Sequence, residues 1–259
     1  MRVIALLTDF GTVDGYVAAM KGRILTLAPQ ATVVDITHDI PPFDIRSGAF
    51  TLYNCYRQFP PQTVFVAVVD PGVGTRRAGV VLQSDHYVFV GPDNGLFSLV
   101  LQNESVSAYH IRTDQLPWEV SHTFHGRDVF APLGALAVAN PEEMMTYLAP
   151  ANHPLQTFWT PPRWETPTRI RAEVLHVDRF GNIILNIRRP DFGDHPLDRL
   201  LVTVKGHDIT GLKKTFGDVR PGELLINFDS SDFLQIAKNQ GNAARELQVQ
   251  PGDEVLIHL

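Results

Sequence analysis

Two patterns of apolar and polar residues divide this chain, and the first extends from the N-terminus to Ala139. Short apolar runs alternate there with longer segments of helical periodicity, as in sheets whose strands are joined by crossover helices. The pattern predicts an α/β N-terminal domain with a mostly parallel sheet and flanking helices. The expected strands are residues 3–7, 32–36, 64–69, 79–83 and 87–90. The expected helices are residues 15–27, 44–59, 95–101 and 128–139.

The second pattern follows a proline-rich stretch. Prolines at positions 150, 154, 161, 162 and 167 break regular elements and favour a semi-rigid connector. Beyond them, short β-type runs are separated by Gly, Pro and Asp turns, which predicts a small all-β, barrel-like C-terminal domain. The expected strands are residues 169–177, 183–187, 200–205, 223–228 and 254–258. We expect domain boundaries at 1–155 for the α/β domain, 156–168 for the linker and 169–259 for the barrel.

Composition narrows the possible classes of protein. A net charge of −6 argues against a nucleic-acid-binding surface, which requires clustered Lys and Arg. The chain contains no apolar run long enough to span a membrane. Cys55 is the single cysteine, so disulfides are excluded, and the start MRVIALLTDFG lacks the features of a secretory signal. We therefore expect a cytoplasmic protein without nucleic-acid or membrane partners.

Two predicted strands end in an aspartate followed by a glycine-containing turn. Asp9 follows the first strand in TDFG, and Asp70 follows the third in VDPGVGTRR. Ligands of open α/β sheets bind at the carboxyl ends of strands, so both carboxylates are candidates for chemistry. Asp9 suits the two hydroxyls of a ribose, or alternatively an N-cap of the next helix.

Two further turns have a functional and a structural interpretation. VDPGVGTRR lacks the Gly-Lys-Ser/Thr ending of a phosphate loop and could simply be a surface turn with an ion pair. His125, in TFHGRDVFAP, is a candidate general base because the ordinary pKa of histidine lies near neutrality. A solvated loop histidine is the structural alternative.

A metal site is conceivable at DITHD, residues 35–39. Strand alternation would place Asp35, Thr37 and Asp39 on one face and His38 on the other, so turn capping before the following prolines explains the segment better. The chain also lacks HExxH, CxxC and GxSxG, which argues against metalloprotease, redox and serine-hydrolase chemistry. We expect no metal and no cofactor.

Several motifs occur together, in an order that resembles one family. They are LLTDFGTVDGYVAAMKG, DITHDIPPFD, VVDPGVGTRR, VGPDNGLF, FHGRDVFAP, VDRFGNIILNI and LQIAKNQGNAA. This series resembles the S-adenosyl-L-methionine hydrolases (adenosine-forming), also called SAM hydroxide adenosyltransferases, which are related to fluorinase and chlorinase. The resemblance covers nearly the whole chain.

The resemblance implies a catalytic triad of Asp70, Arg77 and His125. A fluorinase-like enzyme has tyrosine at the position of Asp70 and a halide-contacting serine at that of Gly126, so the chain favours water over halide. The family's substrate contacts fall here on Asp9, Phe43, Thr123, Phe124, Asp178, Phe180, Asn182, Ser230, Gln235, Lys238 and Gln240. In the C-terminal segment the chain departs from the family, with Asp229 for asparagine, Asp232 for glycine, and Gln235 where glutamate is frequent.

The implied reaction is attack of water on the ribose C5′ of S-adenosyl-L-methionine, which gives adenosine and L-methionine. The family also implies a homotrimer, with each site between the N-terminal domain of one subunit and the C-terminal domain of its neighbour. Asp70 and His125 both remain candidates for the base. Two alternatives are a halogenase acting on the same substrate and a non-catalytic sensor of adenosine or S-adenosylmethionine.

Overall fold

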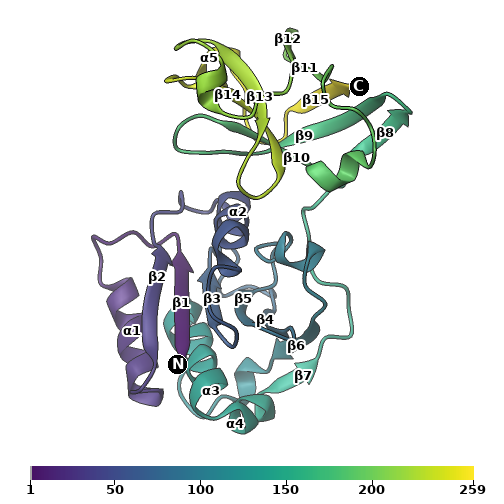
Figure 1. Cartoon of the computed structure of the whole chain (residues 1–259). Helices are drawn as coiled ribbons and strands as arrows, with labels where there is room; N and C mark the ends of the chain where they lie inside the picture. Colours follow the sequence, from purple (N-terminus) through teal and green to yellow (C-terminus); the bar gives the residue numbers. More distant parts are fainter. Residues whose placement is uncertain (1) are drawn as a thin grey trace. The chain divides into compact units, whose positions relative to one another are not determined.

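The computed structural model describes residues 2–259 and contains two compact units, one ending at Trp159 and the other spanning Thr160–Leu259 (Figure 1). The first unit is built on a seven-stranded mixed sheet of order β2-β1-β3-β5-β4-β6-β7. Its strands are β1 (Val3–Thr8), β2 (Thr32–Thr37), β3 (Val64–Val68), β4 (Gly79–Gln83), β5 (Val88–Pro92), β6 (Ser107–Ile111) and β7 (Leu148–Pro150). Its helices are α1 (Tyr16–Leu27), α2 (Ile45–Tyr56), α3 (Ala131–Ala139) and α4 (Pro141–Thr146).

Most strands of this sheet run in one direction. β2, β1, β3 and β5 are parallel neighbours, and only β4 and β7 run opposite to the rest. This arrangement confirms the predicted α/β class with a mostly parallel sheet. β6 and β7 were not predicted, because β6 (SAYHI) has neither strict alternation nor a continuous apolar run and β7 is only three residues long.

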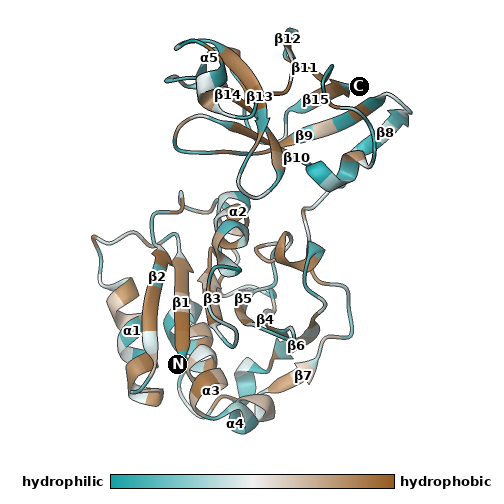
Figure 2. Ribbon diagram, viewed as in Figure 1, coloured by the Kyte–Doolittle hydropathy of each residue, from teal (hydrophilic) through white to brown (hydrophobic). Residues whose placement is uncertain are grey.

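Helices cover both faces of the sheet. β1 and β3 are buried along their whole length and hydrophobic except for Thr8 at the end of β1, as expected of strands covered on both sides (Figure 2). Val66 of β3 faces α3, where a side chain at Gly134 would lie 2.4 Å from it. Phe65, the preceding residue, faces the opposite side and packs against Tyr56 of α2. The close approach at Gly134 places the segment before α3 at the carboxyl end of β3, where the candidate site lies.

The expected helix at 95–101 is wrong. Only a short 3-10 turn forms there, at Val100–Gln102. Gly95 has a positive φ of 98°, and the Asn94 side chain accepts a hydrogen bond from the backbone N–H of Leu96 at 3.2 Å. An Asx turn of this kind competes with helix formation, which explains the difference.

The second unit is an antiparallel sheet that curls nearly into a barrel. Its strand order is β12-β11-β15-β9-β10-β14-β13, with β8 paired to β9. Leu212, just after β12, bridges to Ile226 of β13 and nearly closes the ends. This confirms the predicted barrel-like C-terminal fold. The elements are β8 (Arg163–Thr166), β9 (Arg169–Val177), β10 (Ile183–Arg188), β11 (Leu201–Val204), β12 (His207–Thr210), β13 (Leu224–Phe228), β14 (Phe233–Lys238), α5 (Ala243–Leu247) and β15 (Glu254–His258).

Three strands of this unit were not expected from the sequence. β8 lies within the stretch interpreted as a connector, where the residues between Pro162 and Pro167 still pair with β9. β12 is short and mostly exposed. β14 is nearly all buried and lacks the alternation that marks a half-exposed strand. Within residues 2–259, no helix combines the length and the apolar character that crossing a membrane requires.

Candidate active site

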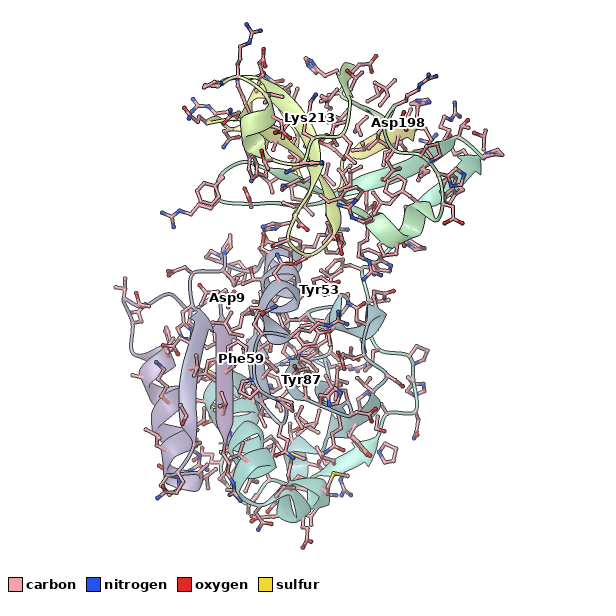
Figure 3. The ribbon with its side chains drawn as sticks, viewed as in Figure 1. Asp9, Tyr53, Phe59, Tyr87, Asp198 and Lys213 are labelled. Carbon is pink, nitrogen blue, oxygen red and sulfur yellow. The ribbon has the colours of Figure 1, made fainter. Side chains whose placement is uncertain are left out.

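A cavity of about 340 Å³ lies at the carboxyl edge of the N-terminal sheet. Asp9 follows β1 at this edge (Figure 3), and Asp70 follows β3. The segment 121–127, which leads into α3, forms the other wall. The cavity is lined by Phe10, Tyr16, Val68, Asp70, Val73, Ser121, Thr123, Phe124, His125, Gly126 and Arg127.

Asp70 and His125 line this cavity, and Arg77, which is not a lining residue, contacts both of them. Arg77 donates two hydrogen bonds to the Asp70 carboxylate. One runs from Nε to Oδ1 at 3.0 Å, and a shorter one runs from Nη2 to Oδ2. The same Nη2 lies 3.2 Å from Nδ1 of His125. The side chains of Asp70 and Arg77 are 4% and 9% exposed, so the pair is nearly shielded from water. The guanidinium also lies over the Phe130 ring, 5.4 Å from its centroid, which fixes its position from the other side.

Glycines allow the two loops of the site to approach each other. Gly74 has a φ of 75°, in the left-handed region that favours glycine. A Cβ at this position would lie 2.4 Å from the carbonyl oxygen of His122. The turn after β3 therefore packs directly on the loop that carries His125, which brings His125 within reach of Arg77.

The electrostatic surroundings keep His125 neutral at pH 7. Burial lowers the pKa of its imidazole, and the positive charge of Arg77 lowers it further, although Asp70 and Asp128 act in the opposite direction. An arginine can only donate hydrogen bonds. Nδ1 of His125 is therefore the acceptor in this contact, and the proton of the neutral ring lies on Nε2.

Asp9 is held by the segment that carries Phe43. Its Oδ2 accepts a hydrogen bond from the backbone N–H of Phe43 at 2.8 Å. Burial raises the pKa of Asp9, this hydrogen bond partly offsets the rise, and the charge of Asp70 adds to it. The N-cap alternative for Asp9 is wrong, because α1 begins after Gly15 and has no side-chain cap. Phe43 is 70% exposed, with a φ of 68°.

Aromatic side chains form one wall of the cavity. The rings of Phe10, Tyr16 and Phe124 meet edge to face, with centroids 5.3 to 5.9 Å apart. Arg127 covers Phe124, with its guanidinium carbon 5.0 Å from the ring centroid. A Cβ at Gly126 would lie 3.1 Å from the Phe10 ring, so a larger side chain there would displace this wall. Sequence reasoning missed Phe10 and Tyr16, although Phe10 lies within the TDFG turn itself.

The expectation that Asp35 and His38 lie on opposite faces is wrong. The pairing of β1 with β2 has an irregularity in which Leu6 faces Asp35 but Leu7 faces Thr37. The extra residue in β2 reverses the alternation, so Nε2 of His38 lies 3.0 Å from Oδ1 of Asp35. No three His, Cys, Asp or Glu side chains in residues 2–259 are arranged to hold a metal ion.

The C-terminal unit has a cavity of its own, of about 360 Å³. Four of the residues expected to contact substrate line it, together with two that were not expected. They are Phe180, Asn182, Lys238 and Gln240, with Phe216 and Gly241. Asp178 organises this loop: its Oδ1 accepts hydrogen bonds from the N–H groups of Phe180 at 2.9 Å and Asn182 at 2.8 Å.

Ser230 and Gln235 do not line this cavity. Ser230 is exposed, and Gln235 is 4% exposed within β14. The nearby Asp229 accepts hydrogen bonds from the N–H groups of Ser231 and Phe233, so it stabilises the turn between β13 and β14. Asp232 has a φ of 64°, a conformation that glycine adopts readily.

Fold and site together define a two-domain protein, an α/β unit and a barrel-like unit, with a polar ligand-sized cavity at the carboxyl edge of the α/β sheet. Residues 4–146 match the N-terminal domain of SAM hydroxide adenosyltransferases, and residues 172–256 match the C-terminal domain. The chain belongs to the SAM hydroxide adenosyltransferase family.

Individual relatives agree with this assignment. The chain is 39% identical to the (R)-S-adenosyl-L-methionine hydrolase of Salinispora tropica, over 98% of this chain and 97% of the relative. It is 27% identical to a fluorinase of an Actinoplanes strain, over 98% and 97% of the two chains. The crystal structure of an uncharacterized conserved protein from Thermotoga maritima matches with a TM-score of 0.86 and 36% identity, over 99% of this chain and 100% of that one.

Proposed function

We propose that this protein hydrolyses S-adenosyl-L-methionine at the ribose C5′, giving adenosine and L-methionine. Family membership and the hydrolase relative support this activity. The observation that carries the proposal is the contact of Arg77 with both Asp70 and His125 at the cavity wall. These three side chains are distant in sequence and combine a carboxylate, a cation and a neutral imidazole around space large enough for a ligand.

The chemistry requires little acid catalysis. The oxygen of water forms a bond to C5′ while the bond from C5′ to sulfur breaks, and the electron pair of that bond goes to sulfur. The leaving group is a neutral thioether, so it needs no proton. The protein must align one water and receive its proton. Alignment can contribute about 7 to 11 kcal/mol to lowering the barrier, and a general base about 10²- to 10⁴-fold in rate.

The contact between Arg77 and His125 favours Asp70 as the proton acceptor. The lone pair of His125 Nδ1 faces Arg77, and Nε2 carries the proton of the neutral ring. His125 is thus arranged to donate a hydrogen bond rather than to remove a proton. We assign the proton of water to Asp70, and we assign Arg77 and His125 to stabilising the hydroxide that develops.

The rest of the cavity suits the nucleoside part of the substrate. Asp9 and Phe43 do not line the cavity, but Asp9 directly precedes Phe10 of its wall. We assign the ribose hydroxyls to Asp9, whose carboxylate accepts a hydrogen bond from the N–H of Phe43. The aromatic wall of Phe10, Tyr16 and Phe124 offers ring faces to a sulfonium cation. Thr123 lines the same cavity. No metal or organic cofactor enters this scheme, and the proposed partner is a small molecule rather than nucleic acid or a membrane.

The barrel-like unit would supply the remaining contacts in a homotrimer. The cavity lined by Phe180, Asn182, Lys238 and Gln240 is the proposed docking surface for the substrate of a neighbouring subunit. Ser230 and Gln235 are weaker candidates for this role, because neither lines that cavity. Analytical ultracentrifugation at several protein concentrations tests the trimer. A protein that is active as a monomer would contradict it.

Incubation with S-adenosyl-L-methionine in ¹⁸O-labelled water tests the activity. Hydrolysis places the label in the 5′-hydroxyl of adenosine, detected by mass spectrometry, and releases methionine. Unchanged substrate that nevertheless binds would indicate a sensor and contradict the proposal. A 5′-halo-adenosine formed in chloride or fluoride would indicate a halogenase. That outcome is disfavoured because a halide-binding serine at position 126 would need the Phe10 ring to shift, since a Cβ there would lie 3.1 Å from it.

A further inference from the structure

His38 is a buried histidine that neither lines the cavity nor takes part in the proposed chemistry. Its side chain is only 4% exposed, although it lies just beyond β2 near the edge of the sheet. Burying a polar ring costs free energy unless its nitrogens find partners. The contacts that His38 makes therefore show what the residue does for the fold.

Each ring nitrogen of His38 faces one specific partner. Nδ1 lies 2.8 Å from the Thr8 hydroxyl oxygen. Nε2 lies 3.0 Å from Oδ1 of Asp35, in a bent contact rather than an aligned hydrogen bond. Lys21 holds the other oxygen of Asp35 at 2.6 Å. Although burial raises the pKa of Asp35, the contacts with Lys21 and His38 outweigh it and lower the pKa, so this carboxylate is ionised at neutral pH.

These contacts join three segments of the chain. The ionised carboxylate of Asp35 faces Nε2 of His38, and Nδ1 of the same ring faces the Thr8 hydroxyl. The Thr8 oxygen in turn accepts a hydrogen bond from the backbone N–H of Phe10, at 3.2 Å. A series of contacts thus runs from Asp35 through His38 and Thr8 into the turn that carries Asp9.

The same segment also holds this turn through its backbone. The carbonyl of His38 accepts from the N–H of Gly11 at 2.8 Å, and the N–H of Phe43 donates to Asp9. Residues 38–43 therefore contact the turn 8–11 at its start, middle and end. Asp9 lies between Thr8, whose hydroxyl contacts His38, and Phe10, whose N–H donates to that hydroxyl.

We propose that His38 is a positioning residue for the ribose-binding carboxylate of Asp9, acting through Thr8 and oriented by Asp35. This inference rests on the proposed function, because it takes the ribose hydroxyls as the ligand of Asp9. His38 touches no substrate in this role. Removing the His38 side chain makes the turn 8–11 less ordered. The affinity of a ligand then falls in proportion to how much of its binding comes from contact with Asp9.

The test compares two nucleosides by isothermal titration calorimetry. Adenosine offers both ribose hydroxyls, whereas 2′,3′-dideoxyadenosine offers neither and cannot bind Asp9 through them. His38→Ala is expected to weaken adenosine binding about tenfold, the effect of losing a well-placed hydrogen bond to a charged group, and to leave dideoxyadenosine binding unchanged. Thr8→Val keeps the shape of the side chain and should reproduce this selective loss.

A conservative variant separates positioning from general stability. His38→Asn places an amide, which can either donate to or accept from the Thr8 hydroxyl, where Nδ1 lies, so it should retain most of the affinity for adenosine even though the contact with Asp35 is lost. His110→Asn, a histidine substitution on β6, is the matched control and should change neither affinity. Melting temperatures of all variants identify any that fail to fold, in which case Thr8→Val and His38→Asn carry the comparison.

Equal weakening of both nucleosides by Thr8→Val and His38→Ala would overturn the proposal, because that is the signature of a general structural role. Unchanged adenosine binding would also overturn it. Wild-type protein that binds adenosine no better than dideoxyadenosine would instead contradict the role of Asp9, which is a failure of the proposed function. The wild-type measurement therefore separates the two kinds of failure.

Discussion

Nη2 of Arg77 contacts both Oδ2 of Asp70 and, at 3.2 Å, Nδ1 of His125. One nitrogen of the guanidinium thus joins the turn after β3 to the segment before α3. The contact both orients the two neighbouring side chains and occupies the lone pair that would make His125 a base.

Arg77→Lys should reduce kcat strongly even though the positive charge is kept. A lysine cannot make the two parallel hydrogen bonds to Asp70 and reach His125 at the same time. Losing one donor to a developing anion typically costs about 10²- to 10³-fold in kcat. Steady-state assays of adenosine release measure the effect, and Arg76→Lys is the control because Arg76 is exposed in the same turn. Equal activity of the two variants would remove Arg77 from the proposed role.

The pH dependence of kcat/KM should report His125 as a neutral group. Burial and the charge of Arg77 lower its pKa, so the neutral form predominates at pH 7, and activity falls as the pH drops through that lowered value. We expect the midpoint of this decline to lie below the ordinary histidine pKa of about 6.5. NMR titration of the ring, with His125→Asn to assign its signal, checks the assignment. A midpoint above the ordinary histidine pKa would contradict it.

Much of the fold could be predicted from the sequence, but some side-chain contacts could not. The carboxyl ends of β1 and β3 were recognisable from apolar runs that end at Asp9 and Asp70, so the sheet edge was predictable. The contact of His38 with Asp35 was not, because one extra residue in β2 reverses the side-chain alternation and leaves no mark in the hydrophobic pattern. A periodic hydrophobic pattern predicts regular helices and strands. An irregularity in strand pairing is seen only in the three-dimensional structure.

The candidate site, like the fold, could be predicted only in part. The resemblance to a known family indicated Asp70, Arg77 and His125, but neither periodicity nor spacing could indicate that a single nitrogen of Arg77 would contact both partners. Tyr16 completes the aromatic wall from the first turn of α1, where 49% exposure resembles an ordinary surface tyrosine. Which exposed side chains border a cavity depends on packing between distant segments.

Gly126→Ser should destabilise the site without introducing halogenation. The new Cβ would lie 3.1 Å from the Phe10 ring and 3.3 Å from the sulfur of Met20, so these side chains must shift. Overpacking of this kind costs about 1 to 3 kcal/mol of folding free energy. Chemical denaturation measures the loss, and Gly22→Ser is the control, because nothing lies within 4 Å of a Cβ there. Efficient formation of a 5′-halo-adenosine by Gly126→Ser would show that the wall adapts and would contradict this argument.

Asp178→Ala should raise KM far more than it lowers kcat. The Asp178 carboxylate holds the loop through the N–H groups of Phe180 and Asn182 and also accepts from the Asn182 side chain at 2.8 Å. Without it, Phe180 and Asn182 lose their fixed positions, whereas Asp70, Arg77 and His125 are untouched. We expect about a tenfold rise in KM, the cost of roughly one net hydrogen bond to a charged group.

The matched control for that loop is Asp253→Ala, because Asp253 likewise accepts a backbone hydrogen bond within a turn of the same unit, from the N–H of Gln250, and neither residue lines the cavity. If Asp178 acts only by stabilising the fold, the two variants should lose similar stability and show the same kinetic constants. If it orders substrate-binding residues, only Asp178→Ala should raise KM at equal folded fraction. A large loss of kcat with unchanged KM would place Asp178 in the chemical step instead and refute the assignment of this loop to binding.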